Sequence, residues 1–131
     1  MWSQLFLHRP KATCFEDSLK AVLTNMCGDI GPEIHCGKSI RTPAGEFHEG
    51  DVVLLSGHAG PCQVLHFISG CTLGTDSDVF FAKLRILCQI RPNTWATRGE
   101  AWCYSDRLVC AVCHVRVAGG IRVWIPRHLA S

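Results

Sequence analysis

Apolar side chains recur at every second position over residues 80–90, and this alternation restricts the fold more than any other feature of the chain. A period of two residues is typical of a β-strand that packs mainly one face on a core. The inward face would carry Phe80, Ala82, Leu84, Ile86, Cys88 and Ile90. The opposite face would carry Phe81, Lys83, Arg85, Leu87 and Gln89. Proline cannot donate to a strand ladder, so Arg91-Pro92-Asn93 is expected to end this long strand.

Other segments have the composition of shorter strands. They cover residues 38–42, 52–55, 62–68, 102–104, 109–117 and 121–125. Within 109–117 we expect Val109, Ala111, Cys113, Val115 and Val117 to face inward, and Cys110, Val112, His114 and Arg116 to face outward. Turns are expected at 43–45 and 58–61, and Gly119-Gly120 is a hairpin signal. Residues 69–78 and 94–101 are expected to be loops, and residues 1–12 show no period.

One helix is predicted near the N-terminus. Thr13 and Glu16 form a capping-box pattern, and Gly28 stands where a helix ends. Between them, apolar residues recur at helical spacing at Phe15, Leu19, Val22, Leu23 and Met26. We expect a helix over residues 14–26 that packs its apolar stripe on the sheet. The chain is therefore predicted to be mainly β, a small SH3-like barrel over residues 37–131 preceded by an N-terminal segment, residues 1–36, that contains the helix.

Composition places the chain among single-domain globular proteins. Its 131 residues are 47% hydrophobic, enough for a core, and no apolar run is long enough for a membrane helix. The first ten residues lack the basic start and apolar stretch of a signal peptide. Nine cysteines is an odd number for a disulfide framework, so we expect reduced thiols in an intracellular compartment.

Metal binding and catalysis find little support in the residue pattern. Cys110 and Cys113 form the only Cys-x2-Cys pair, and on a strand they would point to opposite faces. A second pair of zinc ligands would have to come from scattered cysteines and histidines, which leaves a zinc or cysteine-dependent protein as a minor alternative. We found no nucleophile elbow, oxyanion loop or phosphate-binding loop. No cofactor and no catalytic residue is therefore predicted.

Charge divides the chain into two unequal parts. Residues 1–78 hold five Lys or Arg and nine Asp or Glu, whereas residues 79–131 hold eight and two. The basic part also contains Trp95, Trp102, Tyr104 and Trp124, interleaved with arginines. Such surfaces suit a protein partner or the stacking and phosphate contacts of nucleic acid. Trp102 and Tyr104 would also fit the core or rim of a barrel.

Short phrases of this sequence occur in the order typical of a bromo-adjacent homology (BAH) domain. They are Glu49-Gly50-Asp51-Val52-Val53, the strand 62–68, the turn Arg91-Pro92-Asn93-Thr94, Trp102-Cys103-Tyr104-Ser105-Asp106 and Val112-Cys113-His114-Val115. Residues 46–118 resemble that family, and the turn is one residue shorter than the family's phrase. The resemblance implies a BAH-like barrel that recognises chromatin proteins in the nucleus. Tudor-like and other SH3-like barrels would explain the strands nearly as well.

The resemblance fails where methyl-lysine readers of this family carry the aromatics of their cage. The matching positions here are Cys88, Gln89 and Ile90, which offer no ring to a methylated ammonium. We therefore expect a nuclear, non-catalytic protein-interaction module without such a cage, whose partner is a protein or a histone-tail peptide. The alternative is DNA or RNA binding through the basic part. The predicted contact residues are Lys83, Arg85, Arg91, Trp95, Arg98, Trp102 and Tyr104.

Overall fold

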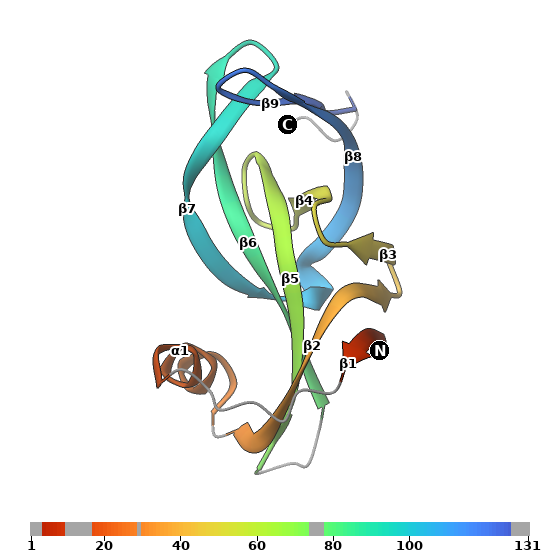
Figure 1. Cartoon of the computed structure of the whole chain (residues 1–131), viewed down its shortest axis with the longest axis vertical. Helices are drawn as coiled ribbons and strands as arrows, with labels where there is room; N and C mark the ends of the chain where they lie inside the picture. Colours follow the sequence, from red (N-terminus) through yellow and green to blue (C-terminus); the bar gives the residue numbers. More distant parts are fainter. Residues whose placement is uncertain (1–3, 10–16, 29, 74–77, 127–131) are drawn as a thin grey trace.

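The computed structural model describes residues 4–9, 17–28, 30–73 and 78–126 of the chain, with side chains for 21–28, 34–73 and 78–126 (Figure 1). The elements are β1 (Gln4–Arg9), α1 (Asp17–Cys27), β2 (Ile30–Thr42), β3 (Gly45–His48), β4 (Val52–Leu55), β5 (Pro61–Thr72), β6 (Asp78–Arg91), β7 (Thr94–Tyr104), a 3-10 turn (Ser105–Arg107), β8 (Leu108–Val117) and β9 (Gly120–Trp124). Within these residues no helix is long and apolar enough to cross a membrane.

Six of the strands close into a barrel. Their order is β5-β4-β8-β9-β7-β6, and β6 pairs back with β5 to complete the circle. The predicted mainly β fold, a small barrel with one helix, is confirmed. β2 pairs with β5, and β1 and β3 pair with β2, so these strands extend the sheet beyond the barrel. β2 is continuous across residues 36 and 37, where the sequence suggested a boundary between the N-terminal segment and the barrel.

The helix lies against the part of the sheet that extends below the barrel (Figure 1). Leu23 of α1 is buried with Ile34, Ile68 and Phe81, which come from β2, β5 and β6. An apolar stripe on a helix gains stability only by packing in this way. The buried side of α1 is thus covered by the part of the sheet that extends beyond the barrel. Thr13 and Glu16 of the predicted cap lie outside the described residues.

Two further clusters of buried side chains hold the barrel together. One joins β4, β5 and β6 to Ile40 of β2 and Phe47 of β3. The other joins Val52, Leu87, Val112 and Val123, one residue from each of β4, β6, β8 and β9. Since β6 contributes Leu84 to the first cluster and Leu87 to the second, both of its faces are covered at different heights. This explains why its apolar residues are less strictly one-sided than the alternation predicted.

Three segments differ from the sequence-based expectation. Residues 94–101 are not a loop but most of β7, which pairs with β6 along almost its whole length. Several of their polar side chains are exposed, and pairing with β6 keeps the segment extended although it includes Ala, Gly and Glu, which are depleted in strands. Residues 69–72 continue β5, and residue 78 begins β6, so the loop predicted at 69–78 is shorter. β1 forms where no period was detected.

The predicted orientation of β8 is also wrong. Val109, Cys113 and Val115 are exposed, whereas Val112 is buried and Cys110 packs against the same cluster. The face that carries Val112 also carries His114 and Arg116, so the polarity pattern alone favours the other face as the inward one. Pairing decides it, because Val112 lies opposite the buried Val52 of β4.

The barrel closes at a short seam between β7 and β9. Only Thr94–Arg122 and Trp95–Ile121 are paired there, and the Val123 amide donates to the Asn93 carbonyl at 2.9 Å. Gly120 allows the two strands to approach, because a β-carbon on it would lie 2.5 Å from the Trp95 carbonyl oxygen. Real β-carbons do not come so close to a backbone atom, so only glycine fits this position without a shift of the seam.

We predict that Gly120→Ala lowers the free energy of unfolding by about 1–3 kcal/mol, the usual cost of forcing extra volume into a packed site. Gly99→Ala in β7 is the matched control, because a β-carbon there meets nothing within 4 Å. Its effect should stay within about 0.5 kcal/mol. Denaturant unfolding followed by circular dichroism measures both. Equal effects of the two substitutions would show that the close approach at Gly120 does not matter.

Candidate functional site

Tyr104 connects the end of β7 to the helix. Its ring lies against Phe81, with ring centroids 5.1 Å apart, and its hydroxyl donates a hydrogen bond to the carbonyl of Met26. That carbonyl belongs to the last turn of α1, where no backbone amide further along the helix can satisfy it. Burial raises the pKa of the Tyr104 hydroxyl, which therefore stays a donor. Tyr104, which the sequence predicted to contact a partner, thus connects β7 to the helix.

Trp102 belongs to a second cluster on the neighbouring part of the sheet. The ring of His66 meets it edge-on with centroids 5.5 Å apart, and Lys83 Nζ lies 5.6 Å from the Trp102 ring centre. Lys83 also pairs with Glu100 at 3.5 Å. The ammonium group is thus held by a carboxylate and a ring within the protein. An external partner of Lys83 or Trp102 would have to compete with these contacts.

The environment of His66 disfavours its charged form. Burial lowers the pKa of the imidazole, and the nearby ammonium of Lys83 lowers it further, against smaller opposing effects of Glu49 and Glu100. A neutral imidazole is the form that packs against Trp102. The packing of His66 against Trp102 therefore favours the neutral imidazole, and protonation of His66 at low pH would weaken it.

Trp95 and Arg91 lie toward the opposite end of the barrel, whereas Arg85 is only two residues from Lys83 on β6 and lies opposite Glu100 of β7. Trp95 is seven residues from Trp102 along β7, which corresponds to roughly 20 Å. Arg91 lies at the end of β6, next to the turn formed by Pro92 and Asn93. Asn93 has a positive φ of 61°, which suits the second central position of a type II turn after proline. The structure therefore divides the predicted set between two places instead of joining it into one surface.

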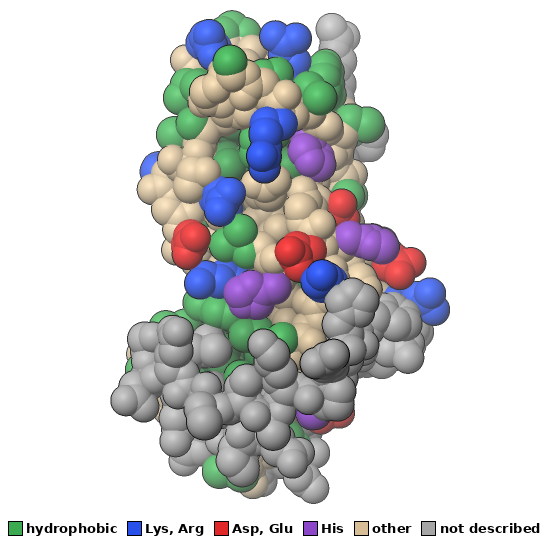
Figure 2. Space-filling view, in the orientation of Figure 1, with side chains coloured by type: hydrophobic (Ala, Val, Ile, Leu, Met, Phe, Trp, Pro, Cys, Tyr) green, Lys and Arg blue, Asp and Glu red, His purple; other side chains and the backbone are tan. Residues whose placement is uncertain are grey.

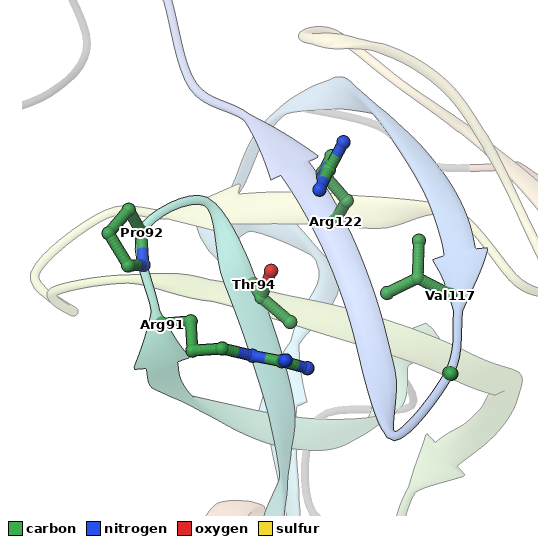
Figure 3. A pocket seen from close by; sticks show the side chains of 6 residues that line it. Arg91, Pro92, Thr94, Val117 and Arg122 are labelled. Carbon is green, nitrogen blue, oxygen red and sulfur yellow. The ribbon is translucent and has the colours of Figure 1, made fainter.

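Two pockets flank the seam at this end of the barrel. The first, of about 420 Å³, is the Arg91–Arg122 pocket (Figure 3), lined by Arg91, Pro92, Thr94, Val117, Ala118 and Arg122. The second, of about 320 Å³, is the Trp95 pocket, lined by Gln63, Arg85, Trp95, Ala96, Thr97, Arg116, Val117, Gly119, Gly120 and Ile121. Thr94–Arg122 and Trp95–Ile121 are successive pairs of the seam, so their side chains point to its opposite faces.

Arginines dominate both pockets. Arg85, Arg91, Arg116 and Arg122, which we call the arginine end, form no ion pair or side-chain hydrogen bond with any other residue that the structure describes. Residues 79–99 and 107–126 contain seven Lys or Arg and no Asp or Glu. Basic side chains accordingly gather at the upper end of the molecule in Figure 2, whereas the visible acidic ones lie lower. This end of the barrel attracts anions.

Trp95 and Arg98 differ in how far they are exposed. Trp95 is half-buried, and its ring lies against Gly60, where a β-carbon would approach it to 3.4 Å. Arg98 is exposed at the register shift of β7 between Thr97 and Gly99. Arg116 and Arg122, which line the pockets, were not among the residues selected from the sequence. The hairpin turn before Gly120 was visible, but the pairing of β9 with β7 was not.

Burial disfavours ionisation of two core cysteines. Burial raises the pKa of Cys62, and it raises that of Cys103 to about 11, so the reactive thiolate is disfavoured in both. Cys110 and Cys113 lie on β8, the first half-buried and the second exposed. In the described part of the chain, no three His, Cys, Asp or Glu residues gather as metal ligands would.

Comparison with known proteins gives no assignment: no family model, no curated protein and no solved structure matches the chain.

Tyr104→Phe should lower the free energy of unfolding by about 1 kcal/mol, because it removes one hydrogen bond and leaves the Met26 carbonyl without its donor. Amide hydrogen exchange should report faster opening of the last turn of α1, where the Gly28 amide donates to Thr24. Exchange in the seam, at the Val123 amide, is the internal control. Unchanged exchange at Gly28 would contradict the proposed connection.

Stability should fall as the pH drops below the ordinary histidine pKa of about 6.5, because the unfolded chain binds a proton at His66 before the folded chain does. The contribution is complete above that pH and is lost as the pH falls toward the lowered folded pKa. Denaturant midpoints measured between about pH 5 and 7.5 should vary less in His66→Gln. The exposed His114→Gln is the matched control. An identical pH dependence in His66→Gln and the unaltered chain would refute this assignment.

Proposed function

We propose that this chain is a non-catalytic protein-interaction module that binds an acidic segment of a partner protein at the arginine end. The observation that carries the proposal is the set of four arginines around two pockets, none of them neutralised by a described carboxylate. Because no internal salt bridge holds these side chains, they can turn toward a ligand at little cost. Arginine is also enriched in protein interfaces.

Exposed apolar residues beside the arginines favour a protein partner. Val115 lies opposite Arg122 in the β8–β9 ladder, and Trp124 is two residues further along the same face. Each of these two side chains is 47% exposed. Nucleic acid backbone offers little apolar surface to cover them, whereas a peptide offers both carboxylates and aliphatic side chains.

Nucleic acid binding is the second candidate function, and the absence of acidic residues in 79–99 and 107–126 favours it. Phosphate contacts by the four arginines would release condensed counterions. Affinity for DNA or RNA would then fall steeply as salt increases. Trp95 is the only aromatic residue lining the two pockets, and its half-buried ring leaves limited area for base stacking.

The BAH resemblance of residues 46–118 supports a narrower form of the proposal, a chromatin-associated adaptor in the nucleus. Its support is the order of short sequence phrases that end at Val112-Cys113-His114-Val115. Lysine-rich histone tails would be repelled by the arginine end. The charge of the pockets therefore favours an acidic segment of a chromatin protein over a histone tail as the partner.

We expect fluorescence anisotropy to detect binding of acidic peptides with interspersed aliphatic residues, and the double substitution Arg91→Ala, Arg116→Ala to weaken it about tenfold or more. Lys38→Ala, an exposed cation on β2, is the matched control and should not change the affinity. Single- and double-stranded oligonucleotides are titrated in parallel at low and physiological salt. Tighter, steeply salt-dependent binding of an oligonucleotide would replace the proposal with the second candidate. Binding of neither class would reject both.

A further inference from the structure

The Arg91–Arg122 pocket is built on one row of residues across the closing seam. Arg91 of β6 pairs with Thr94 of β7, and Thr94 pairs with Arg122 of β9. Directly paired residues place their side chains on the same face with β-carbons about 4.5–5.5 Å apart. The two arginines therefore stand on either side of Thr94, as Figure 3 shows, and both line the same pocket.

Thr94 is a polar residue in an unusual position. It is only 4% exposed, yet its hydroxyl forms no hydrogen bond with another described residue. The hydroxyl oxygen is not among the fully buried polar atoms that lack a partner, so it is open to the pocket. Because Thr94 lines the pocket, its hydroxyl can donate to a ligand that enters between the arginines.

The donors of this row suit a phosphoryl group. Each guanidinium offers several N–H donors in a planar fork, which matches the oxygens of a tetrahedral phosphate. Two arginines can balance the charge of a phosphomonoester, about −1.5 to −2 at neutral pH, whereas a carboxylate carries only one charge. Pro92, Val117 and Ala118 form apolar walls without a competing carboxylate. The pocket is thus a site for a small, doubly charged anion.

The surroundings of the row favour a peptide as the carrier of that phosphoryl group. Val115 continues the row on β8 beyond Arg122, and its exposed side chain would meet the residues next to a phosphorylated one. Ile90, also 47% exposed, precedes Arg91 on β6. A nucleic acid backbone would place sugars and further charges against these apolar groups.

We propose that the Arg91–Arg122 pocket binds the phosphoryl group of a phosphorylated side chain, so that phosphorylation of the partner controls its binding to the barrel. This inference rests on the proposed function and specifies the partner. Arg91 and Arg122 pair with the phosphoryl oxygens, and Thr94 donates a hydrogen bond from the floor of the pocket. The Trp95 pocket lies on the other face of the seam and is not required for this contact.

The test uses the whole chain and degenerate peptide libraries centred on phosphoserine, phosphothreonine or phosphotyrosine. Each library has an unphosphorylated counterpart and one with glutamate at the centre. The phosphorylated form should bind at least about tenfold more tightly than both, and inorganic phosphate should compete. Arg91→Ala and Arg122→Ala should each remove most of that difference. Thr94→Val, which keeps the shape of the side chain, should reduce it by a smaller factor, and Lys38→Ala should leave it unchanged.

The outcomes separate this inference from the proposed function. Equal binding of phosphorylated and glutamate peptides, still weakened by Arg91→Ala, would overturn the phosphoryl site and leave the protein-interaction module intact. Binding of oligonucleotides that inorganic phosphate displaces, with no binding of any phosphopeptide, would also overturn the phosphopeptide site and would favour nucleic acid as the ligand. If the unaltered chain bound none of the peptides, both the phosphoryl site and the proposed protein-interaction function would be rejected. Circular dichroism confirms that each variant is folded, which is expected because Arg91 and Arg122 are exposed.

Discussion

The close approach of β9 to the backbone of β7 is the constraint on which the barrel depends. Two residue pairs and one additional backbone hydrogen bond complete the circle there, against far longer ladders between β5, β6 and β7. So short a seam tolerates little displacement. Gly120 supplies the necessary space, since any β-carbon would collide with the Trp95 carbonyl. The seam also carries the functional candidates, because its two pairs direct Thr94 and Trp95 to opposite faces.

The two ends of the barrel treat their charges differently. Nearer the helix, Lys83 forms an ion pair with Glu100 and lies over the ring of Trp102, so groups within the protein balance its charge. Toward the other end, Arg91, Arg116 and Arg122 form no ion pair with a described residue, whereas Arg85 lies opposite Glu100 in the β6–β7 ladder without forming an ion pair with it. An uncompensated set of cations carries a cost in mutual repulsion, which a bound anion would relieve. This contrast, more than the net charge of +2, supports the arginine end as the proposed binding site.

Local patterns were sufficient to predict the framework of the fold. The alternation at 80–90 identified β6, the proline turn identified its end, and the helical spacing around Leu23 identified α1. Patterns failed where pairing decides the structure. The polar segment 94–101 became a strand because β6 offers it a continuous partner, and β8 took its orientation from the contact of Val112 with Val52. Neither partner is apparent from the segment itself.

The candidate site was predictable only in part, for the same reason. Arg91 beside a tight turn and Trp95 shortly after it attracted attention as residues in a basic segment. Their assignment to two different faces, however, follows from the register of β7 with β9, which joins residues 28 and 26 positions apart in the sequence. Tyr104 suited either a contact surface or the core or rim of the barrel, and its hydrogen bond to Met26 places it against the helix. Sequence reasoning thus recognised the chemistry of individual side chains, but the decisive combination of Arg91, Thr94 and Arg122 exists only because the barrel is closed.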